Sequence, residues 1–234
     1  MPLGHPRLHL RAVDSTNVRA QRLAVSGAPH GTLVTAAGQT AGHGRQGRAW
    51  VTPAGRALAC SLVLREPPRL LPMLAALAVA DVAERFDRAG RSAAIKWPND
   101  VLLDGRKVAG ILAEGRPYEG WTVLGIGVNV AVAPEDLPPE LRATAATLGR
   151  SRAEVEPFLK ELLGRLAAGL AADVATVLDR WRARDALAGR EIRWATGAGV
   201  AHGVDGEGRL VVELPDGGRT TLDAGEVHLG LTRP

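Results

Sequence analysis

The sequence predicts an α+β protein, in which helices cover a sheet and a small all-β unit follows. Two observations predict this class. Strand-like and helix-like apolar patterns alternate up to residue 188, whereas the chain beyond it holds only short strands separated by glycine turns. A chain of 234 residues is long enough for one sizeable core and a small appendage. We therefore expect a main domain at residues 1–188 and a C-terminal unit at residues 189–234.

The first half of the chain predicts three strands and two helices. Apolar residues that alternate with polar ones mark strands, and an apolar period of three to four residues marks helices. We expect strands at residues 8–13, 31–37 and 57–64, and helices at residues 18–24 and 70–89. The second helix should end at Gly90, because glycine readily adopts the left-handed backbone of a helix C-terminus.

The second half predicts a hairpin, a further strand and the helices that cover the sheet. Asp104-Gly105 is a tight-turn signal between strands at residues 101–103 and 107–114. A strand at residues 121–130 pairs next, residues 134–141 form a proline-rich loop, and residues 155–186 form one or two amphipathic helices that stop at Gly189. Short strands at 192–194, 199–204, 209–214, 219–222 and 226–229 predict a small barrel. So small a barrel should pack on the main domain.

A glycine-rich stretch at residues 38–50 is predicted to be a mobile surface loop. Its glycines disfavour a regular helix or strand, and they let backbone N–H groups approach an anion closely. Arg45 and Arg48 add planar donor groups that match carboxylate or phosphate oxygens. The pattern favours a loop that closes over a negatively charged ligand, although the same residues also fit a hairpin loop with solvated charges.

The spacing of Gly42, Gly44 and Gly47 also fits the fingerprint of a dinucleotide-binding fold. That fingerprint requires a helix directly after the glycines, so that the pyrophosphate can lie at the helix N-terminus. Here Pro53 and Gly55 follow, and then the strand predicted at residues 57–64. The dinucleotide-binding interpretation is therefore disfavoured.

Composition narrows the function classes. Cys60 is the one cysteine, so an internal disulfide and a cysteine-based zinc site are excluded, and its apolar strand predicts a buried small residue. The net charge of +4 suits an anionic small molecule or an acidic protein partner, and the basic residues are scattered. The N-terminus lacks the apolar core of a signal peptide, and the longest apolar run is too short to span a bilayer. We expect a soluble, cytoplasmic protein without a membrane partner.

Other stretches carry both a structural and a functional interpretation. Residues 14–17 stack four helix-capping residues where one suffices, so they fit either an N-cap or a site for a polar ligand such as a urea. Gly125 and Gly127 leave one face of their strand without side chains, which indicates close approach by a backbone or a ligand. Trp97 and Trp121 are predicted to be core residues. Lys107, taken alone, would be a solvated lysine at a strand end.

Taken together, these segments resemble the biotin–protein ligases, which attach biotin to the carrier proteins of carboxylases such as acetyl-CoA carboxylase. Lys-Trp-Pro-Asn-Asp is the most specific of the matching motifs, and the resemblance extends over the whole chain. The matching segments are Asp14-Ser15-Thr16-Asn17, Gln39 with Gly42-His43-Gly44-Arg45-Gln46-Gly47-Arg48-Ala49-Trp50, Lys96-Trp97-Pro98-Asn99-Asp100, Lys107-Val108-Ala109-Gly110-Ile111-Leu112-Ala113-Glu114 and Gly125-Ile126-Gly127-Val128-Asn129.

The resemblance implies a fold and a two-step reaction. The fold is a mixed sheet flanked by helices, akin to class II aminoacyl-tRNA synthetases, with a C-terminal SH3-like barrel. In the reaction, biotin and ATP form biotinyl-5′-AMP with Mg²⁺ bridging phosphate oxygens, and a lysine of a biotin carboxyl carrier protein then takes the biotinyl group. The cations Lys107, Arg45 and Lys96 are the implied catalytic residues, since the site must neutralise charge and align the reactants.

The resemblance also implies a set of binding residues. The biotin site would comprise Ser15, Thr16, Asn17, Gln39, Gly42, His43, Gly44, Arg45, Lys107 and Gly110. The ATP site would comprise Arg45, Arg48, Trp50, Lys96, Asn99, Asp100 and Asn129. Metal ligands stay unassigned. Neutral hydroxyls and an amide suit the ureido ring, while an indole face and an asparagine suit adenine.

Two departures and two rival functions complete the expectations. Some family members begin with a DNA-binding winged helix, for which the sequence before residue 14 leaves no room, so DNA is not an expected partner. In the glycine loop of this family, arginine is commoner than histidine at the position of His43. A lipoate–protein ligase or octanoyltransferase is the rival enzyme, and a basic nucleic-acid-binding protein is the rival from another class. A homodimer is compatible with these expectations, but the sequence does not decide the oligomeric state.

Overall fold

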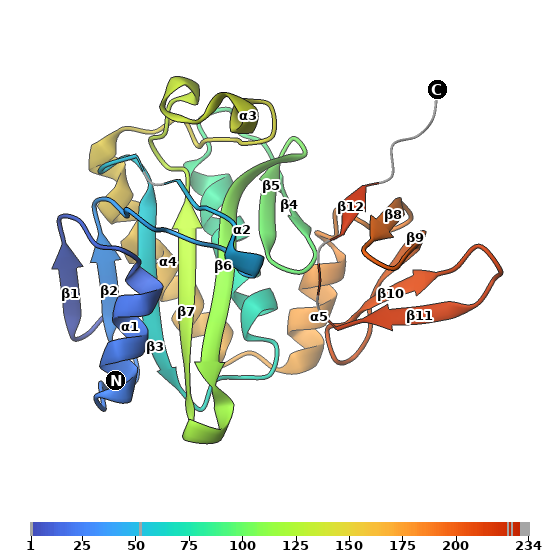
Figure 1. Ribbon diagram of the computed structural model, residues 1–234, viewed down its shortest axis with the longest axis horizontal. Helices are drawn as coiled ribbons and strands as arrows, with labels where there is room; N and C mark the ends of the chain where they lie inside the picture. The colour runs from blue at the N-terminus through green and yellow to red at the C-terminus, as the bar shows by residue number, and fades with distance from the viewer. Residues whose placement is uncertain (1, 52, 224, 226, 230–234) are drawn as a thin grey trace.

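The computed structural model, which describes residues 2–51, 53–223, 225 and 227–229, contains two sheets. The larger has seven strands in the order β1-β2-β3-β7-β6-β5-β4 (Figure 1). Its strands are β1 (Arg7–Leu10), β2 (Leu33–Ala36), β3 (Leu58–Arg65), β4 (Ala93–Lys96), β5 (Asp100–Leu103), β6 (Arg106–Arg116) and β7 (Trp121–Val128). β1 and β2 are parallel and the other pairs are antiparallel, so the predicted mixed sheet is confirmed.

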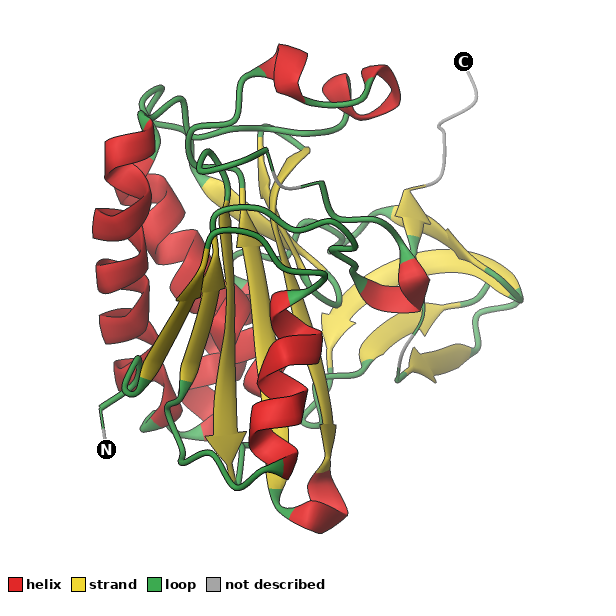
Figure 2. Ribbon diagram, turned by 60° about the vertical axis from the view of Figure 1, so that its left-hand side comes forward, coloured by secondary structure: helices red, strands yellow, loops and turns green. Residues whose placement is uncertain are grey.

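Helices cover both faces of this sheet, as Figure 2 shows. The helices are α1 (Thr16–Val25), α2 (Leu71–Phe86), α3 (Pro139–Arg142), α4 (Val155–Leu170) and α5 (Val174–Arg182). α1 packs on one face through a small apolar cluster that includes Ala20, Val63 and Val123. α2 and α4 pack on the other face, where the main core lies. Because α1 is short, part of its face of the sheet is left for other segments.

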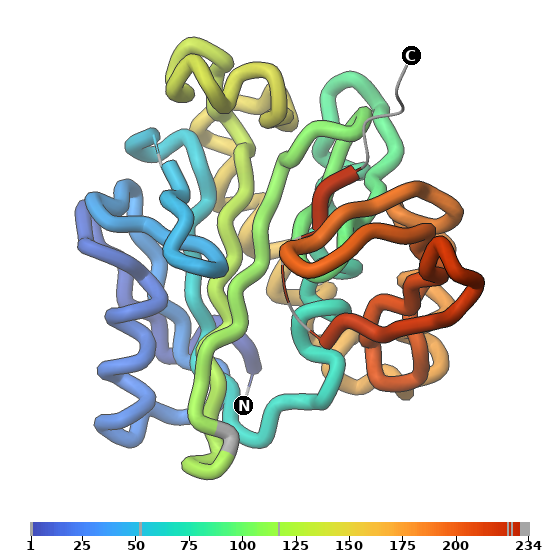
Figure 3. The backbone as a smooth tube through the Cα atoms, turned by 45° about the vertical axis from the view of Figure 1, so that its right-hand side comes forward, coloured from blue at the N-terminus to red at the C-terminus, as the bar shows by residue number. Residues whose placement is uncertain are grey.

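The C-terminal strands form a second sheet with the order β11-β10-β9-β8-β12. Figure 3 shows these strands, in orange and red, packed beside the main sheet. They are β8 (Glu191–Trp194), β9 (Gly197–Val204), β10 (Leu210–Glu213), β11 (Arg219–Leu222) and β12 (His228–Leu229). Their buried residues, such as Ile192 and Leu210, belong to the same apolar cluster as the main core. Strands at the five predicted places are confirmed, although the last is limited to residues 228–229 and residue 226 of that prediction lies outside the described residues. Closure into an SH3-like barrel and a domain boundary at residue 188 stay predictions.

The connection to the C-terminal sheet extends the edge of the main sheet. The backbone N–H of Ile95 donates to the carbonyl of Arg184 over 2.7 Å, and that of Ala186 donates back to Ile95 over 2.9 Å. These bonds cover the free edge of β4, which would otherwise expose unpaired backbone groups. The C-terminal sheet is thereby fastened to the strand that ends at Lys96.

Most predicted elements are confirmed, and the differences have local causes. Asp104 and Gly105 have φ values of 48° and 71°, as the predicted tight hairpin turn requires. α2 ends at Phe86, before the expected Gly90, because the next residue is extended and its carboxylate accepts the N–H of Arg91. The region 155–186 forms two helices, and the predicted loop at 134–141 contains the start of α3. Within the described part of the chain, no helix combines the length and apolar character needed to cross a membrane.

Candidate active site

The floor of the candidate site is a row of paired residues that crosses the main sheet. From β4 the row runs through Lys96, Asp100, Gly110 and Gly127 to Ala59 on β3. Residues directly opposite each other on neighbouring strands point to the same face. One end of the row therefore carries two charged side chains, while the rest has only glycine and alanine. The small residues leave room on the sheet for another group.

A cavity of about 580 Å³ lies above this row. That volume falls in the range of small-molecule sites, roughly 300–1,000 Å³. The start of α1, the glycine loop, the main sheet, residues 137–145 and the end of the C-terminal sheet all contribute to its walls. The site residues predicted from sequence lie around this cavity, with Gly42 as the exception: Ser15, Thr16, Asn17, Gln39, His43, Gly44, Arg45, Arg48, Trp50, Lys96, Asn99, Asp100, Lys107, Gly110 and Asn129.

The glycine loop folds into a small hairpin over the cavity. His43 and Ala49 pair in an antiparallel bridge, and a short 3-10 turn, η1 (Arg45–Gly47), forms the tip. Gly42 does not line the cavity, because it serves the packing of the loop itself. A Cβ at Gly42 would lie 2.6 Å from the carbonyl oxygen of Trp50. Direct contact of Gly42 with a ligand stays a prediction, as does the mobility of the loop.

The paired glycines of β6 and β7 allow an indole ring to lie on the sheet. A Cβ added to Gly127 would come within 2.4 Å of the Trp50 ring, and one added to Gly110 would lie 3.5 Å from it. The group that approaches Gly127 is thus a side chain of the protein, and the predicted approach of a backbone or a ligand stays a prediction. Within the described part of the chain, the buried Nε1 of Trp50 has no hydrogen-bond partner.

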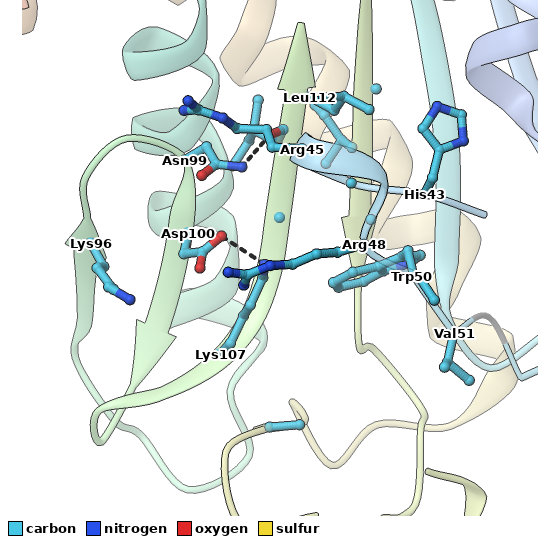
Figure 4. A pocket seen from close by; sticks show the side chains of 18 of the residues that line it. His43, Arg45, Arg48, Trp50, Val51, Lys96, Asn99, Asp100, Lys107 and Leu112 are labelled. Atoms are coloured by element: carbon cyan, nitrogen blue, oxygen red, sulfur yellow. Dashed lines mark hydrogen bonds and ion pairs between the residues drawn. The ribbon is translucent and has the colours of Figure 1, made fainter. Parts of the chain in front are cut away.

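Positive charge gathers at the end of the cavity that β4 and β5 form. Figure 4 shows Lys96, Asp100 and Lys107 directed into the same space. The Nζ of Lys107 lies 2.7 Å from Asp100 Oδ1 and 5.6 Å from the centre of the Trp50 ring. Arg45 and Arg48 add two further cations, and Asp100 is the only carboxylate among the described residues that line the cavity. The excess of cations favours an anionic ligand.

Burial makes this charge costly in the absence of an anion. The pKa of Lys96 is lowered mainly by burial; the nearby Lys107 and Arg48 lower it further, and Asp100 partly opposes the shift. Burial also lowers the pKa of Arg45, again against the attraction of Asp100. A lowered pKa on a cation means that its surroundings disfavour the charge. An anionic ligand would supply the missing counter-charge.

The start of α1 forms the opposite, neutral end of the site. Ser15 makes no capping bond to the helix, so simple N-capping does not account for this residue. The Oε1 of Gln39 accepts both the backbone N–H and the hydroxyl of Thr16, over 2.8 and 3.1 Å. Ser15 and Thr16 are buried although both are polar. Such a cluster of hydroxyls and an amide suits an uncharged polar ligand.

Asn17 belongs to the same cluster but is occupied by the protein. Its Nδ2 donates to Glu114 over 2.8 Å, and its Oδ1 lies 2.6 Å from the Ser61 hydroxyl. Gly125 makes room for it, since a Cβ there would be 2.1 Å from Asn17 Oδ1. The side chain of Asn17 is thus held in one orientation. A direct ligand bond from it stays a prediction.

Two other predicted asparagines are also occupied by the protein, in their case by backbone carbonyls. The Nδ2 of Asn129 donates to the carbonyl of Ala146 over 2.9 Å, and that of Asn99 donates to Ile111 over 2.7 Å. Both residues still line the cavity. Each therefore holds a neighbouring segment in place, and the predicted contacts with a nucleotide stay predictions.

Core assignments made from the sequence are confirmed. Trp97 and Trp121 are buried in apolar clusters, and Trp97 also reaches the cavity wall. Its Nε1 donates to the carbonyl of Gly208 over 3.1 Å, which joins the β9–β10 turn to the segment that carries Lys96. Cys60 is fully buried, and burial raises the pKa of its thiol to about 12, so it is no nucleophile.

Sequence reasoning missed two groups of residues. Ser61 and Glu114 organise the start of α1, and the signal for Ser61 was a lone hydroxyl within an apolar strand. Glu114 stands in a matching motif but had no role assigned. The C-terminal residues Val227, His228 and Leu229 line the cavity as well. No local pattern identifies them, because only the packing of the second sheet brings them there.

Comparisons with known proteins agree with this geometry. Residues 10–131 match the family described as biotin/lipoate A/B protein ligase. The chain is 38% identical to a biotin–[acetyl-CoA-carboxylase] ligase of Paracoccus denitrificans, over 94% of this chain and 99% of that protein. It is 36% identical to a protein of that name from Mycobacterium tuberculosis, over 92% of this chain and 86% of the other. The structure of a biotin protein ligase from Aquifex aeolicus in complex with biotin and ATP is similar, with a TM-score of 0.80, 28% identity, and coverage of 97% and 99% of the two chains.

Proposed function

Since the chain belongs to the biotin/lipoate A/B protein ligase family, we propose that it is an ATP-dependent biotin–protein ligase. In the first step the biotin carboxylate attacks the α-phosphorus of ATP, and biotinyl-5′-AMP and pyrophosphate form. In the second step a lysine amine of a biotin carboxyl carrier protein attacks the acyl carbon, and AMP leaves. One observation supports this best: a single cavity has a neutral polar end and a cationic end.

The neutral end fits the ureido ring of biotin. Ser15 and Thr16 offer hydroxyls, and Gln39 is oriented by its bonds to Thr16. A ureido group has two N–H donors and a carbonyl acceptor without charge, which such groups can pair. The dithiolane of lipoate and the alkyl chain of octanoate have no comparable donors. Buried polar groups here would be left unpaired by those substrates, so the site favours biotin.

The cationic end fits the reacting groups. A carboxylate must approach a phosphate that is already negative, so the site has to offset that repulsion. Lys107 lies centrally, between Asp100 and the ring of Trp50, and we place it beside the biotin carboxylate and the α-phosphate. Arg45, Arg48 and Lys96 would bind the remaining phosphate oxygens. Binding of these anions would relieve the cost of burying Lys96 and Arg45.

The adenine of ATP is assigned to Trp50 and Asn129. An indole face can stack on a base, and the Trp50 ring lies on Gly127 and lines the cavity. Asn129 lines the same cavity and keeps its Oδ1 for the adenine amine, while its Nδ2 binds Ala146. The C-terminal residues 227–229 line the same cavity.

Mg²⁺ would enter with the phosphates of ATP. The described residues contain no group of three or more His, Cys, Asp or Glu that could bind a metal ion by themselves. Mg²⁺ commonly uses one or two carboxylates together with substrate phosphates. Asp100 is the carboxylate at the cationic end and would be its protein ligand. The metal would neutralise part of the phosphate charge, and the cationic side chains would neutralise the remaining charge.

The glycine loop is assigned the role of a lid. An acyl-adenylate is a mixed anhydride that water destroys, so the site must exclude water between the two steps. Residues 38–50 already form one wall of the cavity. Ordering of this loop around biotinyl-5′-AMP would seal the intermediate until the carrier lysine arrives.

We expect biotin to trigger pyrophosphate release and to protect the loop. Purified protein with ATP and Mg²⁺ should release pyrophosphate when biotin is added and stay near background with lipoate or octanoate. In parallel, biotin should slow tryptic cleavage at Arg45 and Arg48, because a closed loop hides these bonds. Release driven by lipoate or octanoate would favour the rival enzyme. Cleavage at an unchanged rate would contradict the lid.

A further inference from the structure

Glu114 occupies an unusual position on the face of the sheet that carries the cavity. Alternate residues of β6 point to this face, so Glu114 follows Gly110 and Leu112 on it. Its partner across β7 is Val123, and the next partner, on β3, is Val63. Both valines are buried in the apolar cluster under α1. A carboxylate at this border needs polar partners, because burial without them is costly.

The partners of Glu114 come from two different segments. Its Oε2 accepts Nδ2 of Asn17 over 2.8 Å and Nε2 of Gln21 over 3.1 Å, both on α1. The same oxygen lies 3.7 Å from Nε2 of His43 in the glycine loop. The side chains of His43 and Glu114 are only 28% and 34% exposed. One carboxylate oxygen therefore joins β6, α1 and the loop.

These bonds set the direction of a hydrogen-bond chain. Because Nδ2 of Asn17 is bound by Glu114, Oδ1 of Asn17 must face Ser61 and accept its hydroxyl. The same Ser61 hydroxyl lies 2.8 Å from Oγ1 of Thr16, and the Thr16 hydroxyl donates to Oε1 of Gln39 over 3.1 Å. Thr16 and Gln39 line the cavity, whereas Glu114 does not. Glu114 thus orients the groups that face the ligand without reaching the ligand itself.

We propose that Glu114 is a positioning residue for biotin, which acts as a latch between the glycine loop and α1. Through Asn17 it fixes the donors and acceptors at the neutral end of the cavity, and through His43 it holds residues 38–50 against that end. This proposal rests on the proposed function for its substrate, biotin. The proposal also explains why a histidine stands at position 43, because its imidazole reaches the Glu114 carboxylate on β6.

The substitution Glu114→Gln tests the latch. It keeps the size of the side chain and one acceptor oxygen, but it removes the negative charge that strengthens the bonds from Asn17 and Gln21 and attracts the His43 imidazole. We expect the KM for biotin to rise about tenfold, as loss of the charge from these contacts predicts, while the KM for ATP and kcat at saturating biotin change less than about twofold. Glu191→Gln, at an exposed position on β8, is the matched control and should change none of these values. An unchanged KM for biotin would overturn the proposal.

A second measurement does not depend on the proposed function. In the absence of any ligand, trypsin should cleave Glu114→Gln at Arg45 and Arg48 several times faster than the wild type. His43→Gln, a change in the loop that leaves the core intact, should accelerate cleavage to a similar extent. The double variant should be cleaved no faster than either single variant. Wild-type cleavage rates in both single variants would overturn the latch. If the wild type released no pyrophosphate with biotin, the proposed function would fail, and these cleavage rates would still decide the latch.

Discussion

Replacing Lys107 with alanine should lower the rate of biotinyl-5′-AMP formation by a factor on the order of 10²–10³, the usual loss when one preorganised group that stabilises a transition state is removed. The reason is twofold. The substitution removes the central cation, and it leaves the Asp100 carboxylate without the ion pair that Lys107 forms with it over 2.7 Å. Lys107 is partly exposed and contributes its backbone, not its side chain, to the pairing with Thr144 and Ala146. The fold should therefore survive.

The measurement is single-turnover adenylate formation, with thermal unfolding as the check on the fold. Lys160→Ala, on the exposed side of α4, removes the same charge far from the cavity and should leave the rate unchanged. Native rates of adenylate formation in Lys107→Ala would show that Lys107 has been misplaced. A loss of cooperative unfolding would show instead that it has a structural role.

The second large effect is expected from Gly127→Ala. A single methyl group at this position would lie 2.4 Å from the Trp50 ring, closer than packed atoms approach, so the indole must leave the sheet. Stacking on an aromatic side chain contributes roughly 1–3 kcal/mol per base, and its loss should raise the KM for ATP by about 10- to 100-fold. The KM for biotin should change less, since the neutral end of the cavity is not touched.

Two comparisons make this experiment specific. Gly164→Ala on α4 adds a methyl group where no atom lies within 4 Å, so it should leave both KM values unchanged. Trp50→Ala should reproduce the loss in ATP affinity, and combining it with Gly127→Ala should add little, because both remove the same platform. Equal ATP affinity in Gly127→Ala and the wild type would exclude the indole from the ATP site.

The sequence predicted those parts of the fold that depend on local chemistry. The Asp104-Gly105 turn was predictable because two neighbouring residues determine its backbone. The apolar runs of β3 and β7 were predictable because both faces of these strands are buried. The predicted end of α2, at Gly90, lies beyond the observed end at Phe86, because a glycine is only one of several signals that stop a helix. Asp87 ends the helix earlier, since its carboxylate accepts the N–H of Arg91.

The candidate site was predictable in its composition but not in its contacts. The residues of the loop at 38–50 indicated cations for an anionic ligand, the resemblance added Lys96, and the structure brings them to one cavity. That Trp50 lies on Gly127, or that Glu114 binds Asn17, depends on segments far apart in the chain that only folding brings together. The same holds for residues 227–229, whose place in the cavity wall follows from the packing of the second sheet.

The most direct test of the account is the complete reaction with a carrier. Protein, ATP, Mg²⁺ and biotin are incubated with a biotin carboxyl carrier domain, and intact-mass spectrometry follows the carrier. We expect one biotinyl group on the carrier, its appearance dependent on both ATP and biotin, and no modification when the acceptor lysine is replaced by arginine. A carrier that stays unmodified while the enzyme remains folded, or one that is modified by lipoate in place of biotin, would contradict the account.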